Sequence, residues 1–221
     1  MNFLFTISEN PLFISGFYPV SNKRKNIFVT VGLPGTGKST FCERIYNNCI
    51  RGTAKIFCRD KYRIKIVNKK RDLPLEKQLD LFKNIDSAVT AAEIDDFAAS
   101  IVGDSHLSTF LFDGCHTLYA DLQILLESIH QVCDRLNESY ALHLCVLGSP
   151  LSKTNHTLTD KKKNDFSDFD TEGNHHAVPV CVMNMKRKEF FALTHPDSFN
   201  RILEYCDYVY SIPAFNIDDF N

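Results

Sequence analysis

The chain has 221 residues, with 25 Lys or Arg against 27 Asp or Glu, and its formal net charge is −2. This length suits one domain of ordinary size, and a content of 44% apolar and 24% charged residues excludes a largely disordered chain. The balanced charge argues against a protein that coats nucleic acid by bulk electrostatics, although it leaves room for a local basic groove.

The N-terminal residues 1–26 carry a segment rich in Phe and Ile. Glu9, Pro11 and Pro19 interrupt it, and the chain has no continuous apolar span of about 20 residues, the length that a membrane helix requires. No basic region precedes Phe3, so we expect neither a secretory signal nor a membrane anchor. We interpret residues 1–26 as a hydrophobic strap that packs on a domain formed by residues 27–221.

Strand-like and helix-like segments alternate along this domain. The apolar runs predict strands at residues 27–31, 54–58, 107–112, 140–147 and 207–212. The helical spacing of apolar residues predicts helices at residues 39–50, 74–102, 119–136, 179–193 and 197–206. This alternation indicates an α/β fold with a parallel sheet and helices on both faces.

Residues 148–176 break the pattern, because they are polar, carry Lys161–Lys163 followed by several acidic residues, and contain few aliphatic side chains. Long loops of this kind inside a compact domain are often lids or binding loops, so we expect a lid here. A solvated insertion without a role is the alternative.

The eight cysteines are scattered, without a CxxC pair or the spacing of a zinc site. In a chain of this length we read them as mostly buried, reduced thiols, which is typical of a cytoplasmic protein.

The strongest motif is a glycine-rich turn between the first predicted strand and helix, and it matches GxxxxGK[ST] at every fixed position. We predict a nucleotide-binding segment made of Gly32, Leu33, Pro34, Gly35, Thr36, Gly37, Lys38, Ser39 and Thr40. The glycines let the backbone approach phosphates, and the loop N–H groups form an anion site at a helix N-terminus. Lys38 is expected to reach the β and γ phosphates, and the Ser39 hydroxyl to bind Mg²⁺.

The second strand ends in Cys58-Arg59-Asp60-Lys61-Tyr62-Arg63. The carboxyl ends of strands in open α/β sheets face the binding crevice, so Asp60 is expected near the γ-phosphate as the general base for an acceptor hydroxyl. Arg59 and Arg63 are candidates for binding the acceptor, and Arg63 could hold a phosphate bidentately. The alternative is that Asp60 caps the following helix while both arginines are solvated.

The third strand ends at Asp113-Gly114. After an apolar strand in a phosphate-loop protein, Asp113 is expected to orient Mg²⁺ together with Ser39. It could instead help to place the acceptor, or be an ordinary turn residue.

The segments GLPGTGKST, CRDKYR and LFDG, in this order, resemble the polynucleotide 5′-kinase-like group of P-loop kinases over about residues 27–190. Zeta-toxin-like kinases and nucleotide-modifying bacterial effectors share this architecture. The resemblance implies a P-loop NTPase fold, a three-layer α/β/α sandwich with a mostly parallel sheet and a lid insertion, and the use of ATP and Mg²⁺. It implies Lys38 and Ser39 as phosphate and Mg²⁺ residues, Asp60 as the general base, and Arg63 as a ligand of an acceptor-side phosphate.

The sequence departs from this group in the lid, where members usually carry arginines. No Arg occurs between Arg135 and Arg187, and this stretch offers only lysines and histidines as basic groups. A lysine supplies positive charge without the bidentate fork of arginine.

These features predict a Mg²⁺-dependent kinase that transfers the ATP γ-phosphate to a hydroxyl of a nucleotide-containing acceptor, first a nucleic-acid 5′-hydroxyl. A small nucleotide metabolite, such as a dinucleotide cofactor or a nucleotide sugar, is an alternative acceptor. A regulatory NTP-binding switch without kinase activity is the alternative from another class. We expect a cytoplasmic protein (in a host cytosol if it is an effector) without an obligate protein partner.

Overall fold

The computed structural model describes residues 3–6, 25–32, 36–69, 73–74, 77, 85–116, 118–147 and 201–212, with residues 3–6 and 211 described through their backbone. The expected lid at residues 148–176 and the expected helix at 179–193 lie outside these residues. Within the described part of the chain, no helix is both long enough and apolar enough to cross a membrane.

The centre of the fold is a six-stranded sheet in which every neighbouring pair of strands is parallel. From one edge to the other the strands are β1 (Phe3–Thr6), β6 (Tyr208–Ile212), β5 (Tyr140–Leu147), β2 (Lys25–Val31), β4 (Thr109–Asp113) and β3 (Ala54–Cys58). All five residues of β4 and six of the seven in β2 are buried. Burial on both faces explains why these strands read as continuous apolar runs without polar alternation.

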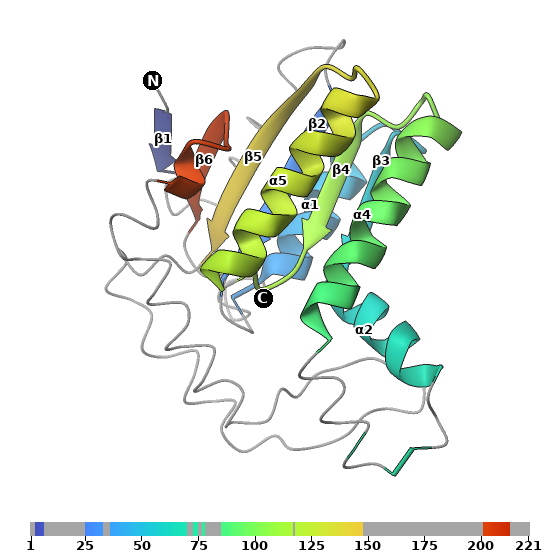
Figure 1. Ribbon diagram of the computed structural model, residues 1–221. Coiled ribbons are helices and arrows are strands. Elements are labelled where there is room, and N and C mark those ends of the chain that lie inside the picture. Colours follow the sequence, from blue (N-terminus) through green and yellow to red (C-terminus); the bar gives the residue numbers. More distant parts are fainter. Residues whose placement is uncertain are drawn as a thin grey trace.

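Helices cover both faces of the sheet and make the three-layer α/β/α sandwich that the sequence predicts (Figure 1). Helices α4 (Asp86–Gly103) and α5 (Tyr119–Arg135) pack on one face, and α1 (Lys38–Asn48) packs on the other. Helix α2 (Arg59–Asn68) begins directly at the end of β3 and contacts α4.

Phenylalanine rings fill the core between the sheet and α4. Phe57 of β3 stacks on Phe112 of β4 with ring centroids 4.8 Å apart, and Phe97 of α4 meets Phe110 edge-on at 5.1 Å. All four rings are fully buried. Such offset and edge-to-face pairs add specific geometry to area burial, which fixes α4 against the sheet.

The predicted strands at 54–58 and 140–147 have the observed bounds, and the predicted helix at 119–136 agrees to within one residue with α5. The helix predicted at 74–102 is interrupted, because Ile85 has a non-helical backbone (φ −100°, ψ 15°) and α4 begins at Asp86. Of the predicted residues before Ile85, the structure describes residue 74, which is not helical, and residue 77, which is helical. Apolar spacing continues through the buried Ile85, so periodicity alone does not reveal this break. Of the helix predicted at 197–206, residues 201–203 are helical and residue 206 is not.

Residues 3–6 of the expected strap form strand β1, which pairs in parallel with β6 from Phe3 opposite Tyr208 to Thr6 opposite Ser211. At these residues the N-terminal segment therefore extends the sheet. The predicted boundary near residue 26 stays a prediction, although β2 already begins at Lys25.

All seven cysteines in the described part of the chain are free thiols, as the scattered pattern predicts. Burial raises the pKa of several of them, including Cys42 and Cys145. A raised thiol pKa lowers the thiolate fraction, so these two residues act as small apolar core groups.

Candidate active site

The candidate site lies where the carboxyl ends of β2, β3 and β4 meet and where α1 and α2 begin, at the lower edge of the sheet in Figure 1. β2 and β4 are neighbours in the sheet, yet the helices that follow them, α1 and α5, cover opposite faces. A crevice at such a topological switch point is the usual ligand site of an open α/β sheet.

The glycine-rich loop joins β2 to α1 at this crevice. The Gly32 N–H donates a hydrogen bond to the Cys115 carbonyl (3.0 Å), which ties the start of the loop to the segment after β4. Gly37 is the N-cap residue of α1 in the left-handed region (φ 86°, ψ 19°), where glycine is favoured. Leu33, Pro34 and Gly35, which belong to the predicted nucleotide-binding segment, lie outside the described residues.

Gly32 has no room for a side chain. A Cβ atom there would lie 2.5 Å from the backbone oxygen of Leu147 and 2.9 Å from Thr36 Oγ1. We therefore expect Gly32→Ala to lower the free energy of unfolding by about 1–3 kcal/mol, the usual cost of overpacking.

Urea denaturation of Gly32→Ala measures this cost. Gly103→Ala is the matched control, because a Cβ at Gly103, the last residue of α4, meets nothing within 4 Å. Equal stabilities of the two variants would contradict the close approach of β5 to the loop.

Helix α1 presents its first turn to the crevice. Lys38 is 7% exposed, whereas Ser39 and Thr40 are exposed. The Ser39 hydroxyl lies close enough to the carboxylate of Asp113, the last residue of β4, to lower its pKa. Lys38 and Ser39 of the motif and Asp113, which were predicted to belong to one site, are thus brought together.

Asp113 is a buried carboxylate, 7% exposed. Burial raises its pKa above the ordinary value, while the Ser39 hydrogen bond and the nearby Lys38 lower it, and the charges of Asp60 and Glu43 raise it further. The Thr30 hydroxyl fixes the adjoining turn, because it accepts a hydrogen bond from the Gly114 N–H (3.2 Å) and lies 3.1 Å from the Phe112 and Gly114 carbonyl oxygens.

Asp60 and Arg63 lie one turn apart on α2 and form an ion pair, with Arg63 Nη1 2.9 Å from Asp60 Oδ1. The Asp60 side chain is 53% exposed and that of Arg63 is 10% exposed. Arg63 Nη2 also hydrogen-bonds the carboxylate of Asp86, the first residue of α4. Burial alone would lower the pKa of Arg63, but Asp86 and Asp60 outweigh it and hold that pKa above its ordinary value.

Arg59, predicted to bind the acceptor, lies in the contact between α2 and α4. It is 3% exposed, and its Nη1 donates to Glu93 Oε2 (2.7 Å) and to Thr90 Oγ1 (3.1 Å). Its Nη2 donates to the backbone oxygen (3.2 Å) and to Oδ1 (3.3 Å) of Asp86. Acceptor binding by Arg59 stays a prediction. In this structure its two terminal nitrogens hydrogen-bond residues of α4.

Glu93 is fully buried, and burial raises its pKa to about 7 despite the opposing effect of Arg59. Because the folded protein binds this proton more tightly than the unfolded chain does (ordinary pKa 4.5), stability falls as pH rises from about 4.5 to about 7. Glu93→Gln cannot titrate. The free energy of unfolding of Glu93→Gln should therefore rise, relative to that of the unmodified protein, by on the order of 1–3 kcal/mol from pH 5 to pH 8.

Urea unfolding at pH 5 and pH 8 measures the effect of Glu93→Gln, with the exposed Glu204→Gln as the control. If the stability of Glu93→Gln and of the unmodified protein changed in parallel with pH, the protonation assigned to Glu93 would be wrong.

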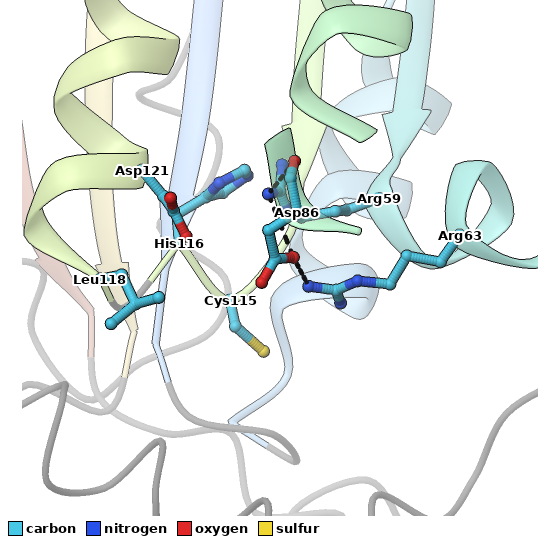
Figure 2. A pocket seen from close by; sticks show the side chains of 7 residues that line it. All are labelled: Arg59, Arg63, Asp86, Cys115, His116, Leu118 and Asp121. Carbon is cyan, nitrogen blue, oxygen red and sulfur yellow. Dashed lines mark hydrogen bonds and ion pairs between the residues drawn. The ribbon is translucent and has the colours of Figure 1, made fainter. Parts of the chain in front are cut away.

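A small pocket adjoins these groups, with a volume of about 10 Å³ that has room for about one water molecule. It is lined by Arg59, Arg63, Asp86, Cys115, His116, Leu118 and Asp121 (Figure 2). His116 has a positive φ of 41°, a backbone conformation that is uncommon for a residue other than glycine and often marks a functional site. Its ring lies so close to Gly114 that a Cβ there would be 2.5 Å from Nε2.

Three residues of this region, Asp86, Glu93 and His116, were not predicted from the sequence. Glu93 carried a usable signal, because it lies one turn from the buried Val89 and one turn from Phe97 and so places a carboxylate on an apolar helix face. Asp86 carried a weaker signal, because an aspartate can mark the start of a helix. The helix predicted at 74–102 runs through this position, so that signal was not used. We find no sequence signal for His116.

Comparisons with known proteins give structural matches only, since no family model and no curated protein sequence matches the chain. A chain of the Pnkp1/Rnl/Hen1 RNA repair complex is 14% identical with a TM-score of 0.46, over 79% of this chain and 47% of that chain. A fungal RNA kinase is 14% identical with a TM-score of 0.48, over 86% of this chain and 76% of that one.

A third match comes from the PezAT chromosomal toxin–antitoxin system of Streptococcus pneumoniae, at 13% identity and a TM-score of 0.40, over 83% of this chain and 60% of that one. This chain thus spans about half of the RNA repair chain. The three proteins come from the groups that the motifs resemble. Since every TM-score lies below 0.5, these likenesses carry no argument about activity, which has to rest on the residues of this chain.

Proposed function

We propose that this protein is a Mg²⁺-dependent kinase that transfers the γ-phosphate of ATP to a hydroxyl of a nucleotide-containing acceptor, first a nucleic-acid 5′-hydroxyl. The observation that carries the proposal is that Lys38, Ser39 and Asp60 all lie close enough to the buried Asp113 carboxylate to shift its pKa. The groups proposed to bind phosphate, to bind the metal ion and to accept the proton thus lie near one another.

The residues present fit a divalent cation held together with ATP. A hydroxyl and a carboxylate are hard oxygen ligands, and Mg²⁺ commonly takes one or two such protein groups together with waters and substrate phosphates. Ser39 and Asp113 would hold the ion, which neutralises charge on the β and γ oxygens when bound. Lys38, supported by the N-terminus of α1, holds the phosphates in position.

Asp60 is proposed to accept the proton of the acceptor hydroxyl. It stands on the first turn of α2 at the carboxyl end of β3, and its half-exposed carboxylate is oriented by Arg63 Nη1. A general base has to be accessible to the substrate, and the 53% exposed side chain of Asp60 meets this condition. Arg63 lines the neighbouring pocket and is proposed to bind a phosphate of the acceptor.

An acceptor panel tests the proposal. The protein is incubated with γ-labelled ATP, Mg²⁺ and, in separate reactions, 5′-hydroxyl oligonucleotides of RNA and DNA, a dinucleotide of the NAD type, and a nucleotide sugar. We expect label on the oligonucleotide 5′ end, and label on a small acceptor instead would correct the acceptor while retaining the kinase. Release of inorganic phosphate without labelling of any acceptor would contradict the kinase and favour an NTP-hydrolysing switch.

A further inference from the structure

A chain of alternating charges runs from solvent into the core, and its three middle members line the pocket. It begins at the exposed Asp60 and continues through Arg63, Asp86 and Arg59 to the fully buried Glu93. Asp86 is the middle member, and Figure 2 shows its carboxylate facing both guanidinium groups.

We propose that the Asp86 carboxylate occupies the position on Arg63 that a phosphate of the acceptor takes, so that the phosphate has to displace Asp86 for the acceptor to bind. Asp86 is then a specificity-determining residue. This inference rests on the proposed function for the existence of an acceptor, and it adds a residue to which neither a motif nor a comparison assigns a role.

The chemistry of Arg63 supports the exchange. A guanidinium binds carboxylates and phosphates through the same fork of N–H donors. In this structure one terminal nitrogen of Arg63 bonds Asp86 and the other bonds Asp60. Of the two carboxylates, only Asp86 lines the pocket, so a phosphate that enters the pocket meets the Asp86 side of the fork.

Asp86 has a second partner that makes its release from Arg63 feasible. The same Oδ1 atom lies 3.3 Å from Arg59 Nη2. Breaking one buried ion pair is costly when a charge is left without a partner. Asp86 avoids this cost, because Arg59 is held in place by Glu93 and Thr90 and can keep the carboxylate when Arg63 turns to a phosphate.

The Asp86 side chain is 20% exposed, so its negative charge can act on a ligand that enters the pocket. Its negative charge repels an incoming phosphate, whereas an uncharged nucleoside neither gains from Arg63 nor loses to Asp86. Removal of the charge at Asp86 should therefore favour phosphate-bearing ligands selectively. A residue that only oriented Arg63 would have the opposite effect, since its loss would weaken phosphate binding.

The test is calorimetric binding of adenosine 3′-monophosphate and of adenosine, with Mg·ADP present to fill the loop site. The 3′-phosphate is chosen because it is the first phosphate that follows the 5′-hydroxyl of a nucleic-acid strand. We expect Asp86→Asn to bind adenosine 3′-monophosphate about tenfold more tightly than the unmodified protein does, because one unfavourable close charge can weaken binding by about this factor. The variant should bind adenosine as tightly as the unmodified protein does. Asp95→Asn, which removes the same charge from an exposed position of α4, should change neither affinity by more than about twofold.

Unchanged or weaker binding of adenosine 3′-monophosphate by Asp86→Asn would overturn the proposal. The double variant Asp86→Asn with Arg63→Gln should not bind adenosine 3′-monophosphate more tightly than the unmodified protein. Tighter binding by this double variant would also overturn the proposal. Thermal unfolding checks that each variant is folded, and Asp86→Ser replaces Asp86→Asn if the latter is not. Because binding is measured without transfer, a tenfold gain in a protein that labels no acceptor would support the exchange at Arg63 and refute the kinase.

Discussion

Asp60→Asn should lower the rate of phosphoryl transfer by about 10²–10⁴-fold, the contribution expected of a positioned general base. The asparagine oxygen can still accept the Arg63 Nη1 hydrogen bond now made to Asp60 Oδ1, so the variant removes proton acceptance with little change in geometry. ATP affinity should stay within about twofold of the unmodified protein, because Asp60 is proposed to act on the acceptor hydroxyl and not to hold the phosphates of ATP. Single-turnover transfer and equilibrium nucleotide binding measure the two quantities separately.

The control for Asp60→Asn is Asp134→Asn, which makes the same change at an exposed position near the far end of α5. It should leave both transfer and ATP binding unchanged. Full transfer activity in Asp60→Asn would show that Asp60 is not the base and would favour its reading as a helix-capping residue.

Lys38→Ala should lower the rate of transfer by about 10²–10³-fold and also weaken ATP binding. Lys38 is 7% exposed at the start of α1, beside Asp113, so its ammonium group acts where solvent screens charges poorly. Its loss removes a fixed positive charge from the developing negative charge of the transferred group. Nucleotide binding followed by calorimetry and transfer from labelled ATP measure both effects.

Lys69→Ala is the control for Lys38→Ala, since Lys69 is an exposed lysine at the C-terminal end of α2. The control should behave like the unmodified protein in both assays. Unchanged ATP affinity and turnover in Lys38→Ala would contradict the assignment of residues 32–39 as a phosphate-binding loop.

Local patterns in the sequence predicted most of the fold. The strands β3 and β5 were predicted to the residue because each is a short apolar run with clear ends, and the P-loop motif lies between a strand and a helix as its chemistry requires. The start of α4 was not predicted. Its first residue, Asp86, contacts Arg59 and Arg63, which lie 27 and 23 positions away in the chain, and local patterns carry no information about such contacts.

The same limit applies to the candidate site. Motifs predicted that Lys38, Ser39 and Asp113 lie together, because each lies at or just after the carboxyl end of a strand in a parallel sheet. The partners of Arg59 could not be predicted, since the contact with Glu93 spans 34 residues and depends on how α2 crosses α4. Strand β1 was likewise missed, because its pairing with β6 joins the two ends of the described chain.

The central claim is that Asp60, Lys38, Ser39 and Asp113 form one site for transfer from ATP to a nucleotide hydroxyl. Intact-mass spectrometry of a 5′-hydroxyl RNA oligonucleotide, incubated with the protein, ATP and Mg²⁺, tests this claim most directly. We predict the added mass of one phosphate on the oligonucleotide, its absence without Mg²⁺, and its absence with Asp60→Asn. An unmodified oligonucleotide, together with no phosphate gained by the small nucleotide acceptors under the same conditions, would contradict the account.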